Sequence, residues 1–205
     1  PYEKAWYGER VPKLKVEFVG NPAADRFQGP RSKVQGPRSQ VQDTSASSVL
    51  LLPGSRIGEL KRHLPVMLNA LSRIQSAKPE VRARMVLPNE PLAQLASVGS
   101  LPAGLEIQIG NLADALAQST IAIASTGTVT MKCAFFGVPT VALYKTSWST
   151  YQIGKRIIQV KYLAMPNLLA NEAIFPELIQ HDATAENIAR AALDLLNEPQ
   201  RREAI

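Results

Sequence analysis

From Val49 onward, short aliphatic segments alternate with segments of helical periodicity, and this alternation constrains the fold more than any other feature of the sequence. Strands are predicted at 49–52, 84–87, 105–109, 120–124 and 140–144, and helices at 57–77, 91–98, 111–118 and 128–136. Strands separated by helices favour a parallel sheet with helices on both faces. The predicted fold class is therefore α/β, a Rossmann-like parallel sheet. In such sheets ligands bind beyond the carboxyl ends of the strands.

The longest predicted helix, 57–77, has its apolar residues on one side. They are Ile57, Leu60, Leu64, Met67, Leu68, Leu71 and Ile74. Pro65 lies inside this span, and proline removes a backbone donor and clashes with the preceding turn. We therefore expect the helix to be kinked at Pro65 or to begin later than residue 57.

The chain before this region divides into two further segments. Residues 1–20 open inside a predicted helix, PYEKAWYGERVP, continue to a short predicted strand at 15–19, and are expected to link to a domain that precedes them. Residues 21–48 are polar and contain QGPRSKV (28–34) followed by QGPRSQV (35–41). Because this unit is too polar to bury a face, we interpret the repeat as a local duplication in a solvated loop. The alternative is that its basic residues, Arg31, Lys33 and Arg38, contact phosphates. The remainder, 49–205, is predicted to be one Rossmann-like domain.

Composition excludes several classes of protein. No run of 18 apolar residues predicts a transmembrane helix. One cysteine rules out an intramolecular disulfide, and one cysteine with two histidines gives no zinc pattern. Cys133 lies in an apolar run and is predicted to be core. The net charge of +6, with a pI near 9.6, is compatible with nucleic acid, an anionic membrane or an anionic small molecule.

The loop Pro53-Gly54-Ser55-Arg56 follows the first predicted strand and precedes a helix. Gly54 permits a positive φ, Ser55 is able to cap the helix, and Arg56 offers a fork of donors to a phosphate. Backbone amides at a helix start attract anions. The alternative is an ordinary capped turn whose arginine faces solvent. The sequence lacks GxxxxGK[ST], so an ATPase-type phosphate loop is not predicted.

A second loop, Ser125-Thr126-Gly127-Thr128, repeats this arrangement of hydroxyls, a glycine and a helix start after the strand 120–124. Two such loops in one sheet favour a ligand with two phosphates, or with a phosphate and a ribose.

A third segment, Met165–Ala170, follows a stretch, 148–162, in which aromatic and basic residues alternate. Such a stretch either rests on an anionic membrane or forms a surface helix whose apolar side faces the core, and the second is the more common arrangement. His63 and His181 are isolated in the sequence, and we expect His63 to be a surface residue of its helix rather than a base. No Ser-His-Asp set or carboxylate pair is found.

Taken together, four blocks resemble the bacterial lipid-A-disaccharide synthases in order and spacing. They are PYEKAWYGERVPKLKVEFVGNPAAD (1–25), LLLPGSRIGELKRHLP (50–65), ASTGTVTMKCAFFGVPTVALYK (124–145) and MPNLLANEAIFPELIQ (165–180). The resemblance covers most of the chain except the repeat region. It implies the C-terminal, nucleotide-sugar-binding half of a two-domain GT-B glycosyltransferase.

The resemblance also implies a reaction. Family members transfer 2,3-diacylglucosamine from its UDP derivative to 2,3-diacylglucosamine 1-phosphate, with inversion and release of UDP, in lipid A and lipopolysaccharide biosynthesis. Gly54, Ser55 and Arg56 would hold the UDP diphosphate, and Ser125, Gly127 and Thr128 would close the other side of the pocket. Asn89 and Asn167 would lie towards nucleotide and sugar; Glu177 and Gln180 belong to the same block without an assigned role.

The sequence departs from the family pattern at two places. Lys132 stands where the family usually has a glutamate that accepts the ribose hydroxyls, and a cation cannot accept those hydrogen bonds, although it can attract a phosphate. PNLLAGR of the family is PNLLANE here, with Asn171 for glycine and Glu172 for a basic residue. The catalytic base of the family is an acidic residue of the N-terminal half, and relatives continue with helices beyond residue 205. We therefore expect no catalytic residue within this chain, weak UDP binding or none, and no turnover by the chain alone.

The resemblance implies no metal or other cofactor, and it implies a cytoplasmic protein peripheral to the inner membrane of a Gram-negative-type bacterium. The implied partners are the two lipid substrates, the membrane surface and the N-terminal domain. Three alternatives stay open: another UDP-sugar GT-B enzyme, a degenerate nucleotide-binding module without catalysis, and nucleic-acid binding through the basic repeat. The last has no recognised nucleic-acid-binding motif in its support.

Overall fold

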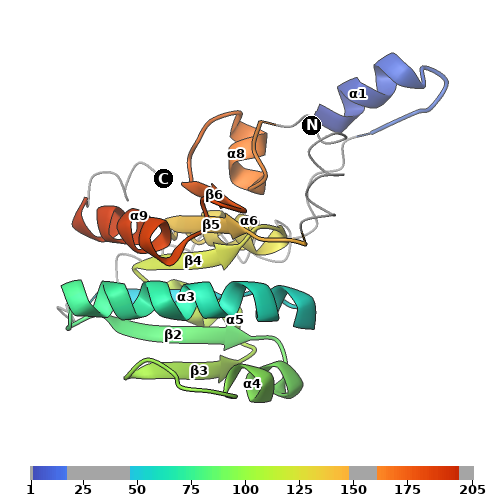
Figure 1. The fold of residues 1–205 in the computed structure, drawn as a ribbon. Helices are drawn as coiled ribbons and strands as arrows, with labels where there is room; N and C mark the ends of the chain where they lie inside the picture. The colour runs from blue at the N-terminus through green and yellow to red at the C-terminus, as the bar shows by residue number, and fades with distance from the viewer. Residues whose placement is uncertain (1, 18–46, 148–160, 199–205) are drawn as a thin grey trace, which may run out of the picture. The chain divides into compact units, whose positions relative to one another are not determined.

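The computed structural model describes residues 2–17, 47–147 and 161–198, and the chain divides into two compact units, Pro1–Ser39 and Gln40–Ile205 (Figure 1). In the first unit, α1 (Tyr2–Arg10) confirms the helix predicted at the start of the chain. The strand predicted at 15–19 is wrong for residues 15–17, which are not in a strand, and its other two residues lie outside the described part.

The second unit contains a six-stranded sheet in the order β3-β2-β1-β4-β5-β6, in which each pair of neighbouring strands is parallel. The strands are β1 (Ser48–Leu52), β2 (Arg82–Leu87), β3 (Leu105–Ile109), β4 (Ile121–Ser125), β5 (Thr140–Tyr144) and β6 (Glu177–Ile179). Among the described residues of this unit, the helices are α3 (Ile57–Ala77), α4 (Glu90–Ala96), α5 (Leu112–Ala117), α6 (Thr128–Phe135), α8 (Met165–Ala170) and α9 (Ala185–Asn197). The α/β, Rossmann-like prediction is confirmed.

Helices cover both faces of the sheet, which explains why the central strands are continuously aliphatic. Val49 and Leu51 of β1 pack into a core shared with α3, α4 and α9. Leu50 and Leu52, which point the other way, pack into a second core with α5 and α6. Each fully buried leucine stabilises the fold by roughly 1.5–3 kcal/mol. In Figure 1, α3 and α9 cross the near face of the sheet.

The helix α3 begins at Ile57 and ends at Ala77, as the apolar periodicity predicted. Pro65 therefore lies inside it, and the alternative that the helix begins later than residue 57 is wrong. Pro65 cannot donate to the carbonyl of Lys61, but both residues lie on the exposed side of the helix. Water is able to satisfy that carbonyl there, which makes an interior proline tolerable.

Neither β6 nor α9 was predicted from the sequence. β6 is only three residues long and half-buried throughout, so it carries little pattern. α9 buries Ile188, Ala192 and Leu195, and its N-cap residue Thr184 accepts a hydrogen bond through its side chain from the amide of Asn187. Within the described residues, no helix is both long enough and apolar enough to cross a bilayer.

Candidate functional site

The strand order places a topological switch point between β1 and β4. From β1 the chain continues through β2 and β3 on one side, whereas from β4 it continues through β5 and β6 on the other. The helices that follow these two strands lie on opposite faces, because α3 packs in one core and α6 in the other. The last residue of β1, Leu52, pairs in register with Ala124 of β4. The loops after β1 and β4 therefore leave the sheet side by side, where open α/β sheets bind ligands.

The loop after β1 is held by a carboxylate that sequence analysis did not single out. Gly54 has φ +124°, and a Cβ atom there would lie 2.5 Å from Oε2 of Glu59. That same oxygen accepts a hydrogen bond of 2.9 Å from the amide of Ser55. The prediction that Ser55 caps the helix is wrong: Arg56 is the N-cap residue and makes no side-chain cap. Glu59 reaches back from the first turn instead.

Arg56 projects from this loop into solvent. Its side chain is 82% exposed, and Nη1 donates to Oε1 of Glu59 at 3.0 Å. An exposed ion pair three residues apart on a helix contributes at most about 0.5 kcal/mol. The guanidinium is therefore able to turn towards a ligand at little cost.

The loop after β4 presents a helix start without a side-chain cap. Gly127 is the N-cap of α6 with φ +143°, and a Cβ atom there would meet nothing within 4 Å. Thr130 donates from Oγ1 to the Gly127 carbonyl at 2.7 Å, which fixes the turn. Thr128 is exposed and Ser125 is 5% exposed. The first amides of a helix have no partner within it, and its N-terminus attracts anions.

Lys132 lies one turn further along α6, where it is half-buried. Its helix begins at the β4 loop, so this cation is on the element that bounds one side of the switch point.

His63 joins two loops at this edge of the sheet. It is 2% exposed, so the prediction of a surface residue is wrong. Nδ1 lies 2.8 Å from the Pro53 carbonyl, and Nε2 accepts from the amide of Lys145 at 3.3 Å. With the proton on Nδ1, the ring donates to the Pro53 carbonyl and accepts from the Lys145 amide; Nε2 also lies 3.2 Å from the Lys145 carbonyl, to which it donates only in the other tautomer. His63 therefore connects the end of β1 with the residue that follows β5.

Glu177, which is half-buried, and Asn167, which is buried, form a hydrogen-bond network around the start of α8. The Glu177 carboxylate accepts from the amides of Leu163 at 2.8 Å and Ala164 at 3.0 Å, and from Nδ2 of Asn167 at 2.8 Å. Asn167 is 0% exposed and also exchanges two hydrogen bonds of 2.7 Å with the backbone of Phe175. The predicted role of Asn167 in binding a ligand stays a prediction. In this structure its side-chain amide connects α8 with Phe175 and Glu177.

The last two predicted residues also have local partners at the carboxyl edge. Gln180 follows β6 with φ +50°, and its Oε1 accepts from the amide of Thr146 at 2.8 Å. Asn89 follows β2 and caps α4 by accepting from the amide of Leu92 at 3.2 Å. Both residues therefore lie in loops at the carboxyl ends of parallel strands, where the sequence predicted ligand-binding residues. The ligand roles of Gln180 and Asn89 stay predictions.

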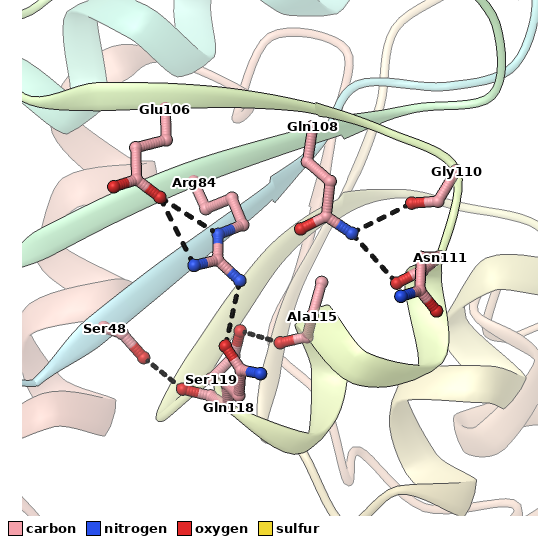
Figure 2. Close-up of polar contacts among 9 residues, drawn as sticks. All are labelled: Ser48, Arg84, Glu106, Gln108, Gly110, Asn111, Ala115, Gln118 and Ser119. Carbon is pink, nitrogen blue, oxygen red and sulfur yellow. Dashed lines mark hydrogen bonds and ion pairs between the residues drawn. The ribbon is translucent and has the colours of Figure 1, made fainter.

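A pocket of about 530 Å³ lies elsewhere, on the α5 side of β2 and β3 (Figure 2). Its polar groups bind one another: Arg84 forms an ion pair with Glu106 at 3.3 Å and donates to Gln118 at 3.1 Å. Gln108 donates to the backbone of Gly110 and Asn111. Since these donors are matched within the chain, the pocket is a weaker candidate than the switch point.

Among residues 2–17, 47–147 and 161–198, no three His, Cys, Asp or Glu side chains gather closely enough to hold a metal ion. Cys133, the predicted core cysteine, is confirmed as buried; burial raises the pKa of its thiol to about 11. The basic repeat at 28–41 and most of the amphipathic stretch 148–162 lie outside the described residues.

Comparison with known proteins identifies relatives over the whole chain. A family model described as lipid-A-disaccharide synthetase matches residues 1–205. The lipid-A-disaccharide synthase of Nitrosococcus oceani is 35% identical over 209 residues, covering 100% of this chain and 53% of that protein. That of Syntrophus aciditrophicus is 34% identical, covering 100% and 54%. The chain thus spans about half the length of the curated relatives it matches.

Solved structures share the fold at low sequence identity. A spinosyn rhamnosyltransferase complexed with thymidine diphosphate has a TM-score of 0.54 at 20% identity, covering 78% of this chain and 40% of that one. WaaG, a glycosyltransferase involved in lipopolysaccharide biosynthesis, has a TM-score of 0.54 at 14% identity, covering 86% and 45%. At these identities the likeness establishes the fold alone.

Proposed function

The chain belongs to the lipid-A-disaccharide synthetase family, and on that premise we propose that it is the donor-binding half of an inverting glycosyltransferase. The reaction transfers 2,3-diacylglucosamine from UDP-2,3-diacylglucosamine to 2,3-diacylglucosamine 1-phosphate and releases UDP. One observation carries this proposal for the chain itself: the loops after β1 and β4, each a glycine-containing turn into a helix, leave the sheet side by side.

The geometry suits a diphosphate. Two helix N-termini that meet at one edge supply positive potential from the backbone, and Arg56 adds a charged fork that can reorient. Stabilising the leaving diphosphate is the electrostatic part of such a transfer. The ribose and the sugar would extend from there towards Lys132 and the segment 165–170.

A general base must take the proton of the acceptor hydroxyl. By the family resemblance this base is an acidic residue of the N-terminal half, which corresponds to none of the residues 1–205. We therefore propose that this polypeptide alone binds donor without transferring sugar. Both lipid substrates would meet the full enzyme at the cytoplasmic surface of the inner membrane, where it acts as a peripheral protein that needs no metal.

A second candidate, a nucleotide-binding module without catalytic activity, is favoured by Lys132. A lysine at a position where the family has a ribose-binding glutamate removes an acceptor from the donor pocket. Restoring the glutamate by Lys132→Glu tests this candidate: UDP affinity should recover if the site has only lost its ribose acceptor.

The proposal is tested by titration calorimetry of UDP against the 205-residue chain, with ADP as the control nucleotide. Binding of UDP that ADP does not reproduce supports a donor site. Equal binding of both nucleotides, or binding of neither by a chain that unfolds cooperatively, contradicts it.

A further inference from the structure

The Glu59 carboxylate occupies the donors of the β1 loop. Oε2 accepts from the Ser55 amide at 2.9 Å, and Oε1 accepts from Arg56 Nη1 at 3.0 Å. The same side chain fills the space beside Gly54, where its Cβ atom would lie 2.7 Å from a Cβ added to the glycine. One intramolecular anion therefore bridges a backbone amide and a guanidinium. These two donors belong to the set assigned above to the diphosphate.

A carboxylate and a phosphate cannot both bind the single Ser55 amide proton, and they compete for the Arg56 guanidinium, which has further N–H donors beside the one that binds Glu59. An amide proton directs one hydrogen bond, and two anions that close repel each other. The contacts of Glu59 are also weak enough to break, because its side chain is 30% exposed and Arg56 is 82% exposed. A diphosphate, which carries more charge and more acceptor oxygens than a carboxylate, is able to replace it.

We propose that Glu59 is an internal competitor for the anion-binding loop, so that a nucleoside diphosphate enters by displacing its carboxylate from Ser55 and Arg56. This inference rests on the proposed function, because it assigns the same loop to the diphosphate. The apparent affinity equals the intrinsic affinity multiplied by the fraction of molecules whose site is open. If the carboxylate occupies the site in nine-tenths of the molecules, the apparent affinity is about tenfold lower. A ligand without a phosphate does not compete with Glu59.

The competing explanation gives Glu59 a structural role only. A first-turn glutamate that reaches back to an amide stabilises the helix start. In that case its loss loosens the loop, and anions bind with unchanged or lower affinity. The two explanations therefore predict opposite signs for the change in affinity.

The experiment is calorimetry on the 205-residue chain with UDP, inorganic pyrophosphate and uridine, comparing wild type with Glu59→Gln. Glu186→Gln is the matched control, because Glu186 also lies in the first turn of a helix, α9, and pairs with an arginine, Arg73. We expect Glu59→Gln to tighten UDP and pyrophosphate about tenfold. Uridine affinity stays the same, and Glu186→Gln changes none of the three.

Each other outcome is informative. If wild type binds UDP but Glu59→Gln leaves this binding unchanged or weaker, the competitor is refuted and the donor site stands. If pyrophosphate tightens while neither protein binds UDP, the competitor stands and the nucleotide assignment fails. Binding of neither ligand by either folded protein overturns both. Should Glu59→Gln not fold, Glu59→Asp keeps the charge on a side chain one methylene shorter, and it must shift affinity in the same direction.

Discussion

Leu52 of β1 and Ala124 of β4 are register partners in adjacent parallel strands. Because one strand ends at Leu52 and the other one residue after Ala124, the turns at Gly54 and Gly127 begin at the same edge of the sheet. Neither turn alone distinguishes a binding loop from an ordinary strand-to-helix connection. Their adjacency makes the proposal specific.

Arg56→Ala tests the charged partner of the proposed diphosphate. We expect UDP affinity to fall about tenfold to a hundredfold, since a hydrogen bond to a charged group contributes about 1.5–3 kcal/mol. Thermal unfolding should not change, because the side chain is 82% exposed and its only described ion pair is with Glu59. Calorimetry measures the affinity, and Arg73→Ala, another exposed arginine paired with a glutamate, is the control. Equal losses in both variants would mean that net charge, not position, governs binding.

Gly54→Ala tests the close approach of Glu59. Gly54 and Gly99 have nearly the same φ, +124° and +119°, but an added Cβ meets Glu59 at Gly54 and nothing within 4 Å at Gly99. Both substitutions incur backbone strain of about 1–3 kcal/mol. Gly54→Ala should lower the free energy of unfolding by about 1 kcal/mol more than Gly99→Ala, because the added Cβ displaces the Glu59 carboxylate and breaks its hydrogen bonds. Urea unfolding provides the comparison, and equal losses would show that Glu59 moves aside freely.

His63→Leu tests the link between the ends of β1 and β5. The leucine fills much of the buried space but leaves the Pro53 carbonyl and the Lys145 amide without their side-chain partner. Each unsatisfied group costs about 1–3 kcal/mol, so the loss of both contacts should lower the free energy of unfolding by about 2–6 kcal/mol. His63→Asn, which places a donor near the position of Nδ1, should lose less. A leucine variant as stable as wild type would show that water replaces both contacts.

Lys132→Glu separates an altered donor site from one that has lost its function. We expect tighter UDP binding, about tenfold, because a carboxylate accepts hydrogen bonds from the ribose hydroxyls. The gain should vanish with 2′,3′-dideoxy-UDP, and Lys132→Ala should not reproduce it. If Lys132→Glu weakens UDP instead, the lysine serves the phosphates and the ribose is held elsewhere.

Cys133 gives a prediction about pH. Burial raises the pKa of its thiol from 9.0 to about 11, so the folded state disfavours the thiolate. Its contribution to stability is complete below the unfolded pKa and is lost as pH rises from about 9 to about 11, at about 2–3 kcal/mol in total. Cys133→Ala should remove this part of the alkaline loss of stability in urea titrations at pH 8 and pH 10.5. A thiol reagent that labels the native chain quickly at pH 8 would contradict the burial on which this rests.

The regular part of the fold could be predicted because its signals are local. The bounds of β3, β5 and α3 match their predicted ranges residue for residue, since aliphatic runs and helical periodicity are read directly from the sequence. β6 could not be predicted from the sequence, because three half-buried residues give no periodic pattern. Their extended conformation depends on pairing with β5, which the local sequence does not encode.

The side chains that organise the candidate site were harder to predict for a different reason. Glu59 lies four residues after Ser55, whereas a capping box has its glutamate three residues after the serine. The N-cap residue of α3 is Arg56, and arginine is not a residue type that caps helices with its side chain. His63 contacts Lys145, 82 residues away, which no local pattern encodes. The loops themselves were predictable from glycine, hydroxyl and basic residues at strand ends.

If the β1 and β4 loops hold one ligand together, a UDP titration of the ¹⁵N-labelled chain, followed by two-dimensional NMR, will show it. We expect the amide signals of Ser55, Arg56 and Thr128 to shift together and give a single dissociation constant, while those of Glu106 and Gln108 in the other pocket do not move. Shifts confined to one loop, or centred on Glu106 and Gln108, would contradict it.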